Sequence, residues 1–236
     1  MESKTTEISN TIKESLIKKG ASIVGFASLH EIADQLHYSM PFAILIAVAL
    51  NPQIISKIAE GPTLEYCREY KNINDLLTEL STYAANLIKD SGHNAIPKAA
   101  TNSEIDDLQS TPLPHKTIAT RAGIGWIGKC ALLVTPAYGS AIRITSVFTD
   151  LKLAAGKAIN YSKCDECTVC VDKCPAHAIS GRNWEVNLKR EDFYDYSKCR
   201  KIAQNYARNL KYEDSICGIC ISVCPWTKKY LNRTDR

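Results

Sequence analysis

The stretch from Cys164 to Pro175 reads CDECTVCVDKCP, with the spacing C-x2-C-x2-C-x3-C-P. This spacing is typical of bacterial segments that wrap a 4Fe-4S cluster, in which the fourth cysteine ligates a second cluster. A related segment follows at Cys217, Cys220, Cys224 and Pro225, with the spacing C-x2-C-x3-C-P. Two related segments in one chain predict two 4Fe-4S clusters.

The second segment lacks one ligand, because Asp214 stands where its first cysteine would fall. Cys199 lies between the two segments and can supply the missing thiolate. Since the fourth cysteine of each segment crosses to the other cluster, two sets of ligands are predicted. The first set is Cys164, Cys167, Cys170 and Cys224, and the second set is Cys174, Cys199, Cys217 and Cys220.

Structural zinc and disulfide bonds are the alternative uses for these cysteines. Zinc would take four cysteines per site, but the x2, x2, x3-Pro run is not a zinc spacing. Iron in such clusters takes thiolate ligands. Eight clustered thiolates indicate a reducing and anaerobic cytoplasm rather than a secreted protein with disulfides. Cys67 lies outside both segments and is expected to be structural.

Length and composition predict a cytoplasmic protein of one or two domains. The chain has 236 residues, of which 45% are hydrophobic, so it can bury a good core. The composition changes after Gly156, which predicts domains over 1–157 and 158–236.

Membrane and nucleic-acid partners are not expected. The polar start MESKTTEISN is no signal peptide. The apolar stretch from Met40 to Leu50 is too short to span a bilayer and contains Pro41. A net charge of +4 is mild, so a general affinity for nucleic acid is not indicated.

Hydrophobic periodicity predicts mixed helices and strands before the cysteine segments. Turn residues such as Gly20 and Gly92 are expected to end the first and the longest of the helices. The unbroken apolar run over 42–50 predicts a central buried strand. The other elements expected are helices over 6–19, 29–36, 73–88, 115–122 and 196–210, and strands over 23–26, 131–135 and 141–149.

A glycine-rich motif, GIGWIGK, runs from Gly123 to Lys129 and satisfies the pattern G-x-G-x-x-G. Asp150 even lies at the distance of a ribose-binding acid. A dinucleotide site needs a strand before this motif and a helix after it, whereas the preceding TIATRA is not strand-like and the following residues are β-rich. The motif therefore predicts either a tight turn or a place where backbone approaches a ligand beside Trp126.

Residues 121–150, RAGIGWIGKCALLVTPAYGSAIRITSVFTD, and the cysteine segments ending in CPW at Trp226 resemble epoxyqueuosine reductases. These are cobalamin-dependent iron–sulfur enzymes related to reductive dehalogenases. The resemblance implies an α+β fold, with an N-terminal corrinoid-binding α/β sandwich of nitroreductase-like topology and a C-terminal ferredoxin-like two-cluster domain. It also implies a corrinoid site that is lined or shaped by Gly123, Gly125, Trp126, Gly128, Lys129, Cys130, Tyr138, Gly139 and Ser140.

Departures from the family pattern argue against epoxide reduction on tRNA. The family has a catalytic aspartate fourteen residues before the position of Gly123, where this chain has Gln109. Glutamine cannot exchange the proton. The chain also ends soon after Cys224, without the extension that many members use with tRNA. His115 is the remaining candidate for a proton donor or an upper ligand to cobalt, although a histidine at a helix start is commonly structural.

The expected function is a corrinoid-binding iron–sulfur oxidoreductase that passes low-potential electrons through two clusters to cobalt. The cobalt would belong to its own cobalamin or to a partner corrinoid protein, and a donor of the ferredoxin or flavodoxin type would supply the electrons. Cys130 could face cobalt as a soft ligand or be a small buried hydrophobe. Two alternative functions stay open: an epoxyqueuosine reductase-like enzyme for another substrate, and a non-enzymatic electron carrier with two clusters.

Overall fold

The computed structural model describes residues 2–101 and 111–233. Their internal contacts divide the chain into two compact units. The first unit comprises residues 1–49, 72–124 and 143–159, and the second comprises 50–71, 125–142 and 160–236. This division differs from the predicted boundary after residue 157, because the second unit also draws two segments from the N-terminal half.

A four-stranded sheet forms the centre of the first unit. Its strands are β1 (Ile23–Ser28), β2 (Phe42–Ala49), β6 (Ile142–Thr149) and β3 (Ala95–Pro97), in the order β1-β2-β6-β3. β1 and β2 are antiparallel, as are β3 and β6. In β2 all side chains up to Val48 are buried, so the predicted central buried strand is confirmed.

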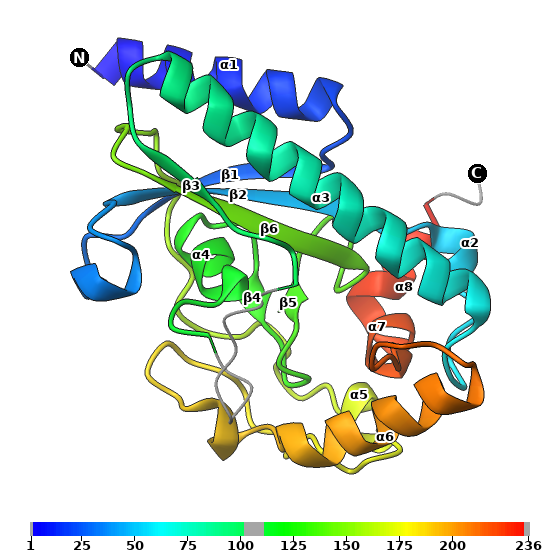
Figure 1. Ribbon diagram of the computed structural model, residues 1–236. Helices are drawn as coiled ribbons and strands as arrows, with labels where there is room; N and C mark the ends of the chain where they lie inside the picture. Colours follow the sequence, from blue (N-terminus) through cyan, green and yellow to red (C-terminus); the bar gives the residue numbers. More distant parts are fainter. Residues whose placement is uncertain (1, 102–110, 234–236) are drawn as a thin grey trace. The chain divides into compact units, whose positions relative to one another are not determined.

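Two long helices cover one face of this sheet (Figure 1). α1 (Glu2–Lys18) and α3 (Leu64–Asp90) begin earlier in the chain than the periodicity predicted. Side chains of one parity in each strand point towards these helices, because successive residues of a strand face opposite sides. The resulting core includes Leu16 of α1, Phe26 of β1, Ile44 and Ile46 of β2, and Leu77, Leu80 and Ala84 of α3.

The opposite face of the sheet packs against α4 (His115–Arg121) and the residues that follow it. Gly25 of β1 permits this approach, because a Cβ atom there would lie 2.5 Å from Cδ1 of Ile124. The short helix predicted over 115–122 is therefore confirmed as α4.

The helix predicted over 29–36 is wrong. The structure has only a 3-10 turn there, η1 (Asp34–Leu36). The carbonyl of Ile32 is bonded by the ring Nε2 of His37 at 3.0 Å instead of by a helical amide. The chain then turns through Tyr38 and Ser39, whose φ angles are 59° and 55°. An apolar pattern cannot reveal such side-chain bonds to the backbone.

Short elements joined by loops make up the second unit. The predicted helix over 196–210 is confirmed as α6 (Tyr196–Asn209), and Asp195 caps it by accepting from the amide of Lys198 at 3.0 Å. A small core of Ile127, Ala131, Trp184 and Phe193 lies in this unit. Its other elements are α2 (Pro52–Ile55), β4 (Trp126–Ile127), β5 (Leu133–Val134), α5 (Val169–Asp172), η2 (Arg190–Asp192), α7 (Ile219–Val223) and α8 (Pro225–Leu231).

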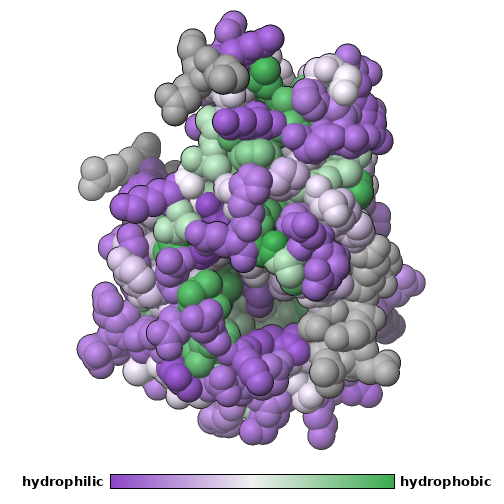
Figure 2. Space-filling model, turned by 90° about the vertical axis from the view of Figure 1, so that its left-hand side faces the viewer, coloured by the Kyte–Doolittle hydropathy of each residue, from purple (hydrophilic) through white to green (hydrophobic). Residues whose placement is uncertain are grey.

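The face of the molecule in Figure 2 is mostly hydrophilic, with hydrophobic side chains gathered in small patches. Across residues 2–101 and 111–233, the structure has no helix that is both long and apolar enough to span a membrane.

Candidate iron–sulfur site

The first set of cysteines comes together in the second unit. Cys164, Cys167, Cys170 and Cys224 all line one cavity. Burial raises the pKa of Cys224, while the amides of Thr227 and Trp226 donate to its sulfur and lower it. Repulsion from Cys164 and Cys170 raises that pKa further. The two cysteine segments are thus close enough to share a cluster.

Three members of the second set also lie close together. Burial raises the pKa of Cys217, and the neighbouring Cys199 and Cys174 add to this rise. The Sγ atom of Cys174 accepts a hydrogen bond from the amide of Ala178 at 3.5 Å. Cys199 lies in the first turn of α6, so the start of that helix brings the distant thiol to the other two.

Cys220 borders both sets. It lines the cavity of the first set, and it also lies near the Tyr194 hydroxyl, which is hydrogen-bonded to Cys199 of the second set. A residue with this position suits two neighbouring clusters. The assignment of Cys220 to the second set stays a prediction.

The arrangement of the thiols bears on the zinc and disulfide alternatives. All ten cysteines are free thiols. Among the residues that the structure describes, no three His, Cys, Asp or Glu side chains are grouped to hold a single metal ion. A tetrahedral zinc site needs such a group, whereas a cubane cluster binds its thiolates at four separate corners. The preference for clusters over zinc rests on the cysteine spacing, which is not a zinc spacing.

A pair of tryptophans adjoins the first set. The rings of Trp126 in β4 and Trp226 in α8 meet edge to face, with centroids 5.0 Å apart. Trp226 lines the cavity of the first set. Trp126 is only 1% exposed, and its Nε1 has no hydrogen-bond partner among the described residues. A buried donor without a partner costs about 1–3 kcal/mol, so an acceptor on a bound group would stabilise this site.

The glycines of the predicted corrinoid site have packing roles within the chain. A Cβ atom at Gly125 would lie 2.2 Å from the carbonyl oxygen of Val134, and one at Gly128 would lie 2.9 Å from Cγ2 of Val134. At Gly123 the φ angle is +71°, and a Cβ atom would lie 2.5 Å from the carbonyl oxygen of Lys157. These spaces are filled by protein, so the glycines by themselves do not indicate a ligand.

The turn over 135–140 packs against α8 and is hydrogen-bonded to it. A Cβ atom at Gly139 would lie 2.2 Å from the amide nitrogen of Thr227. The amide of Ser140 donates to Oγ1 of Thr227 at 3.1 Å, and the rings of Tyr138 and Tyr230 meet edge to face at 5.0 Å. Since α8 follows Cys224 directly, the turn supports the helix that positions this ligand.

Lys129 and Cys130 are both buried in the wall of the cavity. A hydrogen bond with Cys170 lowers the pKa of Cys130, but the contact with Cys220 and burial raise it more, so the net pKa lies well above the ordinary value. Cys130 is therefore a buried thiol beside members of both ligand sets.

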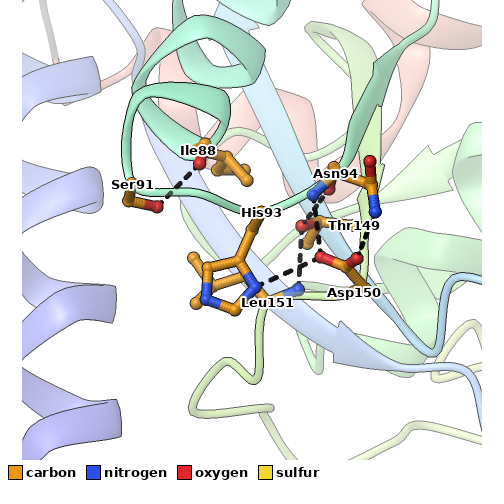
Figure 3. A network of polar contacts seen from close by, with 7 residues as sticks. All are labelled: Ile88, Ser91, His93, Asn94, Thr149, Asp150 and Leu151. Atoms are coloured by element: carbon orange, nitrogen blue, oxygen red, sulfur yellow. Dashed lines mark hydrogen bonds and ion pairs between the residues drawn. The ribbon is translucent and has the colours of Figure 1, made fainter.

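The rejection of a dinucleotide site agrees with the structure. The glycine motif follows a helix, α4, contains the short strand β4 and precedes another strand, β5. A dinucleotide site needs the reverse order, with a strand before the motif and a helix after it. Asp150 follows strand β6 and is hydrogen-bonded to His93 and Asn94, which precede the neighbouring strand β3 (Figure 3). It accepts from the amide and from Nδ2 of Asn94 at 2.9 and 2.6 Å, and its Oδ1 lies 3.3 Å from Nδ1 of His93. Burial raises the Asp150 pKa, but these bonds outweigh it and hold that pKa below the usual range.

His115 lies in the core of the first unit. Its Nε2 is 3.0 Å from the carbonyl oxygen of Ala99, and its Nδ1 is 2.8 Å from Oγ of Ser146. A carbonyl can only accept, so Nε2 carries the proton and Nδ1 accepts from the serine. Burial lowers the pKa of His115 to about 4. The role of His115 as a proton donor stays a prediction, while Gln109 lies outside the described residues.

A lysine and a tyrosine that the sequence did not single out meet in the first unit. Nζ of Lys98 donates to the hydroxyl of Tyr38 at 2.8 Å, and the Tyr38 ring lies 5.6 Å from that of Phe148. Tyr38 is 44% exposed and has a positive φ angle of 59°, which is uncommon for a residue other than glycine and costs energy. The pair therefore places two proton-bearing groups in contact in the first unit.

Comparison with known proteins links the cysteine region to a described family. Residues 163–227 match the 4Fe-4S double cluster binding domain. The chain is 31% identical over 139 residues to an epoxyqueuosine reductase of Synechocystis sp., which covers 56% of this chain and 48% of that protein. It is 29% identical over 190 residues to a tetrachloroethene reductive dehalogenase of Dehalobacter restrictus, which covers 77% of this chain and 31% of that protein. The chain thus spans less than half of the length of either relative.

Solved structures share the fold. A catabolic reductive dehalogenase in complex with 3-bromo-4-hydroxybenzoic acid matches with a TM-score of 0.74 at 17% identity, over 94% of this chain and 32% of that chain. An epoxyqueuosine reductase with a tRNA stem loop matches with a TM-score of 0.62 at 18% identity, over 94% and 66%. The predicted α+β class with a two-cluster region is confirmed. The chain is accordingly similar in sequence to epoxyqueuosine reductases and reductive dehalogenases, and its residues 163–227 match the 4Fe-4S double cluster binding domain.

Proposed function

We propose that this protein is a corrinoid-dependent iron–sulfur oxidoreductase that passes low-potential electrons through two 4Fe-4S clusters to cobalt. The cobalt belongs to its own cobalamin or to a partner corrinoid protein, and a donor of the ferredoxin or flavodoxin type supplies the electrons. The observation that carries the proposal is the position of Cys220. This cysteine lines the cavity of the first set and also interacts with Tyr194, which is hydrogen-bonded to Cys199 of the second set. Two clusters that share such a neighbour can exchange electrons.

The residues of the second unit hold and shield the clusters. The first set would ligate one cluster and the second set the other, and the clusters supply one-electron transfer when bound. The amides of Trp226 and Thr227 donate to the sulfur of Cys224, and such bonds stabilise the reduced cluster. Trp226 in the cavity wall keeps water from the first set, and water exclusion is one of the factors that tune cluster potential.

Support for a corrinoid comes from the relatives and from one buried atom. A solved reductive dehalogenase that shares the fold, with a TM-score of 0.73 at 16% identity, is described in terms of B12-dependent dehalogenation. In this chain the unpartnered Nε1 of Trp126 offers a hydrogen bond to a bound group. The predicted glycines would shape the site by building the turns that carry Trp126, rather than by making room for the ring.

Titration of the anaerobic protein with cob(II)alamin tests the proposal. Binding should shift the absorption and EPR spectra towards the form in which the dimethylbenzimidazole does not ligate cobalt, and the corrinoid should stay with the protein on gel filtration. Trp126→Phe should weaken binding about tenfold, because it removes the indole N–H but keeps a ring against Trp226. Gly125 is a poor target, since a side chain there would clash with Val134. With no spectral change and no retained corrinoid, the two-cluster electron carrier becomes the better account.

The Tyr38–Lys98 pair favours a second candidate function, an enzyme that also protonates its own substrate. A solvent-exposed phenol with a cationic partner would be an unusual requirement for an electron carrier. Tyr38→Phe should leave corrinoid binding and cobalt reduction unchanged, while it slows any turnover that ends in protonation by about 10²-fold or more. Equal turnover by this variant and the wild type would exclude Tyr38 as the proton donor.

A further inference from the structure

Tyr194 lies outside both cysteine segments, yet the fold brings it to the second set. The chain from Phe193 to Asp195 pairs with the chain that follows Cys174. The amide of Ser180 donates to the carbonyl of Phe193 at 3.1 Å, and the amide of Asp195 donates to the carbonyl of Ala178 at 2.8 Å. Tyr194 itself forms an antiparallel bridge with Ile179. The backbone of Tyr194 is therefore held between the chain that follows Cys174 and the helix α6, which carries Cys199.

The side chain of Tyr194 is also fixed. Its ring packs against the small core that contains Ile127, Trp184 and Phe193. The hydroxyl forms a hydrogen bond with the sulfur of Cys199 and lies near Cys220. A thiolate sulfur accepts and a phenol donates. When Cys199 is a thiolate ligand, the Tyr194 O–H therefore points its proton at a sulfur of the second set.

We propose that Tyr194 is a positioning residue that sets the reduction potential of the second cluster by donating a hydrogen bond to the ligating sulfur of Cys199. Hydrogen bonds to sulfur are among the factors that determine cluster potentials. Reduction adds negative charge to the cluster and its ligands, so a donor at a ligand sulfur stabilises the reduced form more than the oxidised form. Loss of the donor lowers the potential.

The Tyr194 donor belongs to a side chain, whereas several other donors around the clusters are backbone amides. Cys217 and Cys224 receive their bonds from the backbone amides of Ile219, Trp226 and Thr227. The Tyr194 bond can thus be removed while the backbone and the thiolates stay in place. The difference between the two cluster potentials decides where a single electron resides, so Tyr194 would control the distribution of that electron. The proposal needs the two clusters but not the corrinoid.

EPR-monitored redox titration of the reconstituted full chain tests this role. In Tyr194→Phe, one of the two midpoint potentials should fall, so that the reduced-to-oxidised ratio of that cluster at a fixed potential drops about tenfold. Such a change corresponds to about 59 mV for a one-electron couple. The other midpoint and the iron content should not change. Tyr161→Phe is the matched control, because it removes the phenol hydroxyl of a residue that is 64% exposed, and both of its midpoints should equal those of the wild type.

A second variant covers the case in which Tyr194→Phe does not retain its clusters. A fluorotyrosine at position 194 keeps the ring and the hydroxyl but makes the O–H a stronger donor, so the same midpoint should rise. Unchanged midpoints in either variant with full iron content would overturn the proposal. A parallel shift of both midpoints would also overturn it, because a change in solvent access moves both clusters whereas the bond to Cys199 concerns one. Neither outcome depends on cobalamin binding.

Discussion

At the scale of the residue, His115 illustrates how burial limits the chemistry of a side chain. Both ring nitrogens are engaged, one with the Ala99 carbonyl and one with the Ser146 hydroxyl. Burial lowers the pKa of this histidine from 6.5 to about 4. The neutral ring therefore stabilises the fold fully above pH 6.5, and this contribution is lost as the pH falls towards 4. The total loss amounts to about 3 kcal/mol.

Ring NMR of histidines labelled with nitrogen-15 should find His115 neutral from pH 7.5 down to pH about 5.5. A single tautomer with the proton on Nε2 is expected, because the carbonyl of Ala99 fixes it. Half protonation of His115 near pH 6.5 would contradict the buried, doubly bonded ring and would revive this residue as a proton donor.

Single residues also show which features of the site can be predicted from the sequence. The cysteine spacing is local, so two ligand sets can be predicted from the sequence, and the assignment of each cysteine to a set stays a prediction. The space at Gly139, in contrast, is filled by the backbone of Thr227, and that of Gly123 by Lys157. Such contacts join residues far apart in the chain, and a sequence motif cannot tell a glycine needed for packing from one needed for a ligand. The Tyr38–Lys98 pair escaped prediction for the same reason.

Among the helices and strands, α6 carries Cys199, the predicted ligand of the second set that lies outside both cysteine segments. The missing cysteine at Asp214 predicted Cys199 as a ligand of the second set, and the hydrophobic periodicity separately predicted a helix over 196–210. In the structure Asp195 caps α6, and Cys199 is near Cys174 and Cys217. The helix predicted over 29–36 does not form, because the side chain of His37 bonds to the backbone carbonyl of Ile32. Hydrophobic periodicity does not contain this information.

Cys199→Ser should reduce the iron and sulfide of the reconstituted protein from about eight of each to about four, since a hydroxyl is a poor ligand for a cluster. Anaerobic reconstitution followed by iron and sulfide analysis measures this. Cys67→Ser is the matched control, because Cys67 is buried in α3 and lies in neither ligand set. Full iron content in the Cys199 variant would mean that another group completes the second cluster.

At the scale of the whole molecule, the chain combines an α+β unit with a cysteine-rich unit, and the two are interleaved in sequence. Segments 50–71 and 125–142 belong to the second unit, where the turn over 135–140 is fastened to α8. Composition changes only after Gly156, so it could not indicate this interleaving. The relatives in sequence are longer, and this chain spans 48% of one and 31% of another. Their activities therefore guide the proposal here without defining it.

Electron transfer from the clusters to cobalt can be followed directly. Protein with both clusters is reduced anaerobically, freed of excess reductant and mixed with cob(II)alamin, and the absorption of Co(I) is followed in a stopped-flow instrument. We expect Co(I) to form while the cluster absorption returns, with up to two electrons delivered per chain and much less from Cys199→Ser. Clusters that stay reduced beside unchanged cob(II)alamin would contradict this expectation.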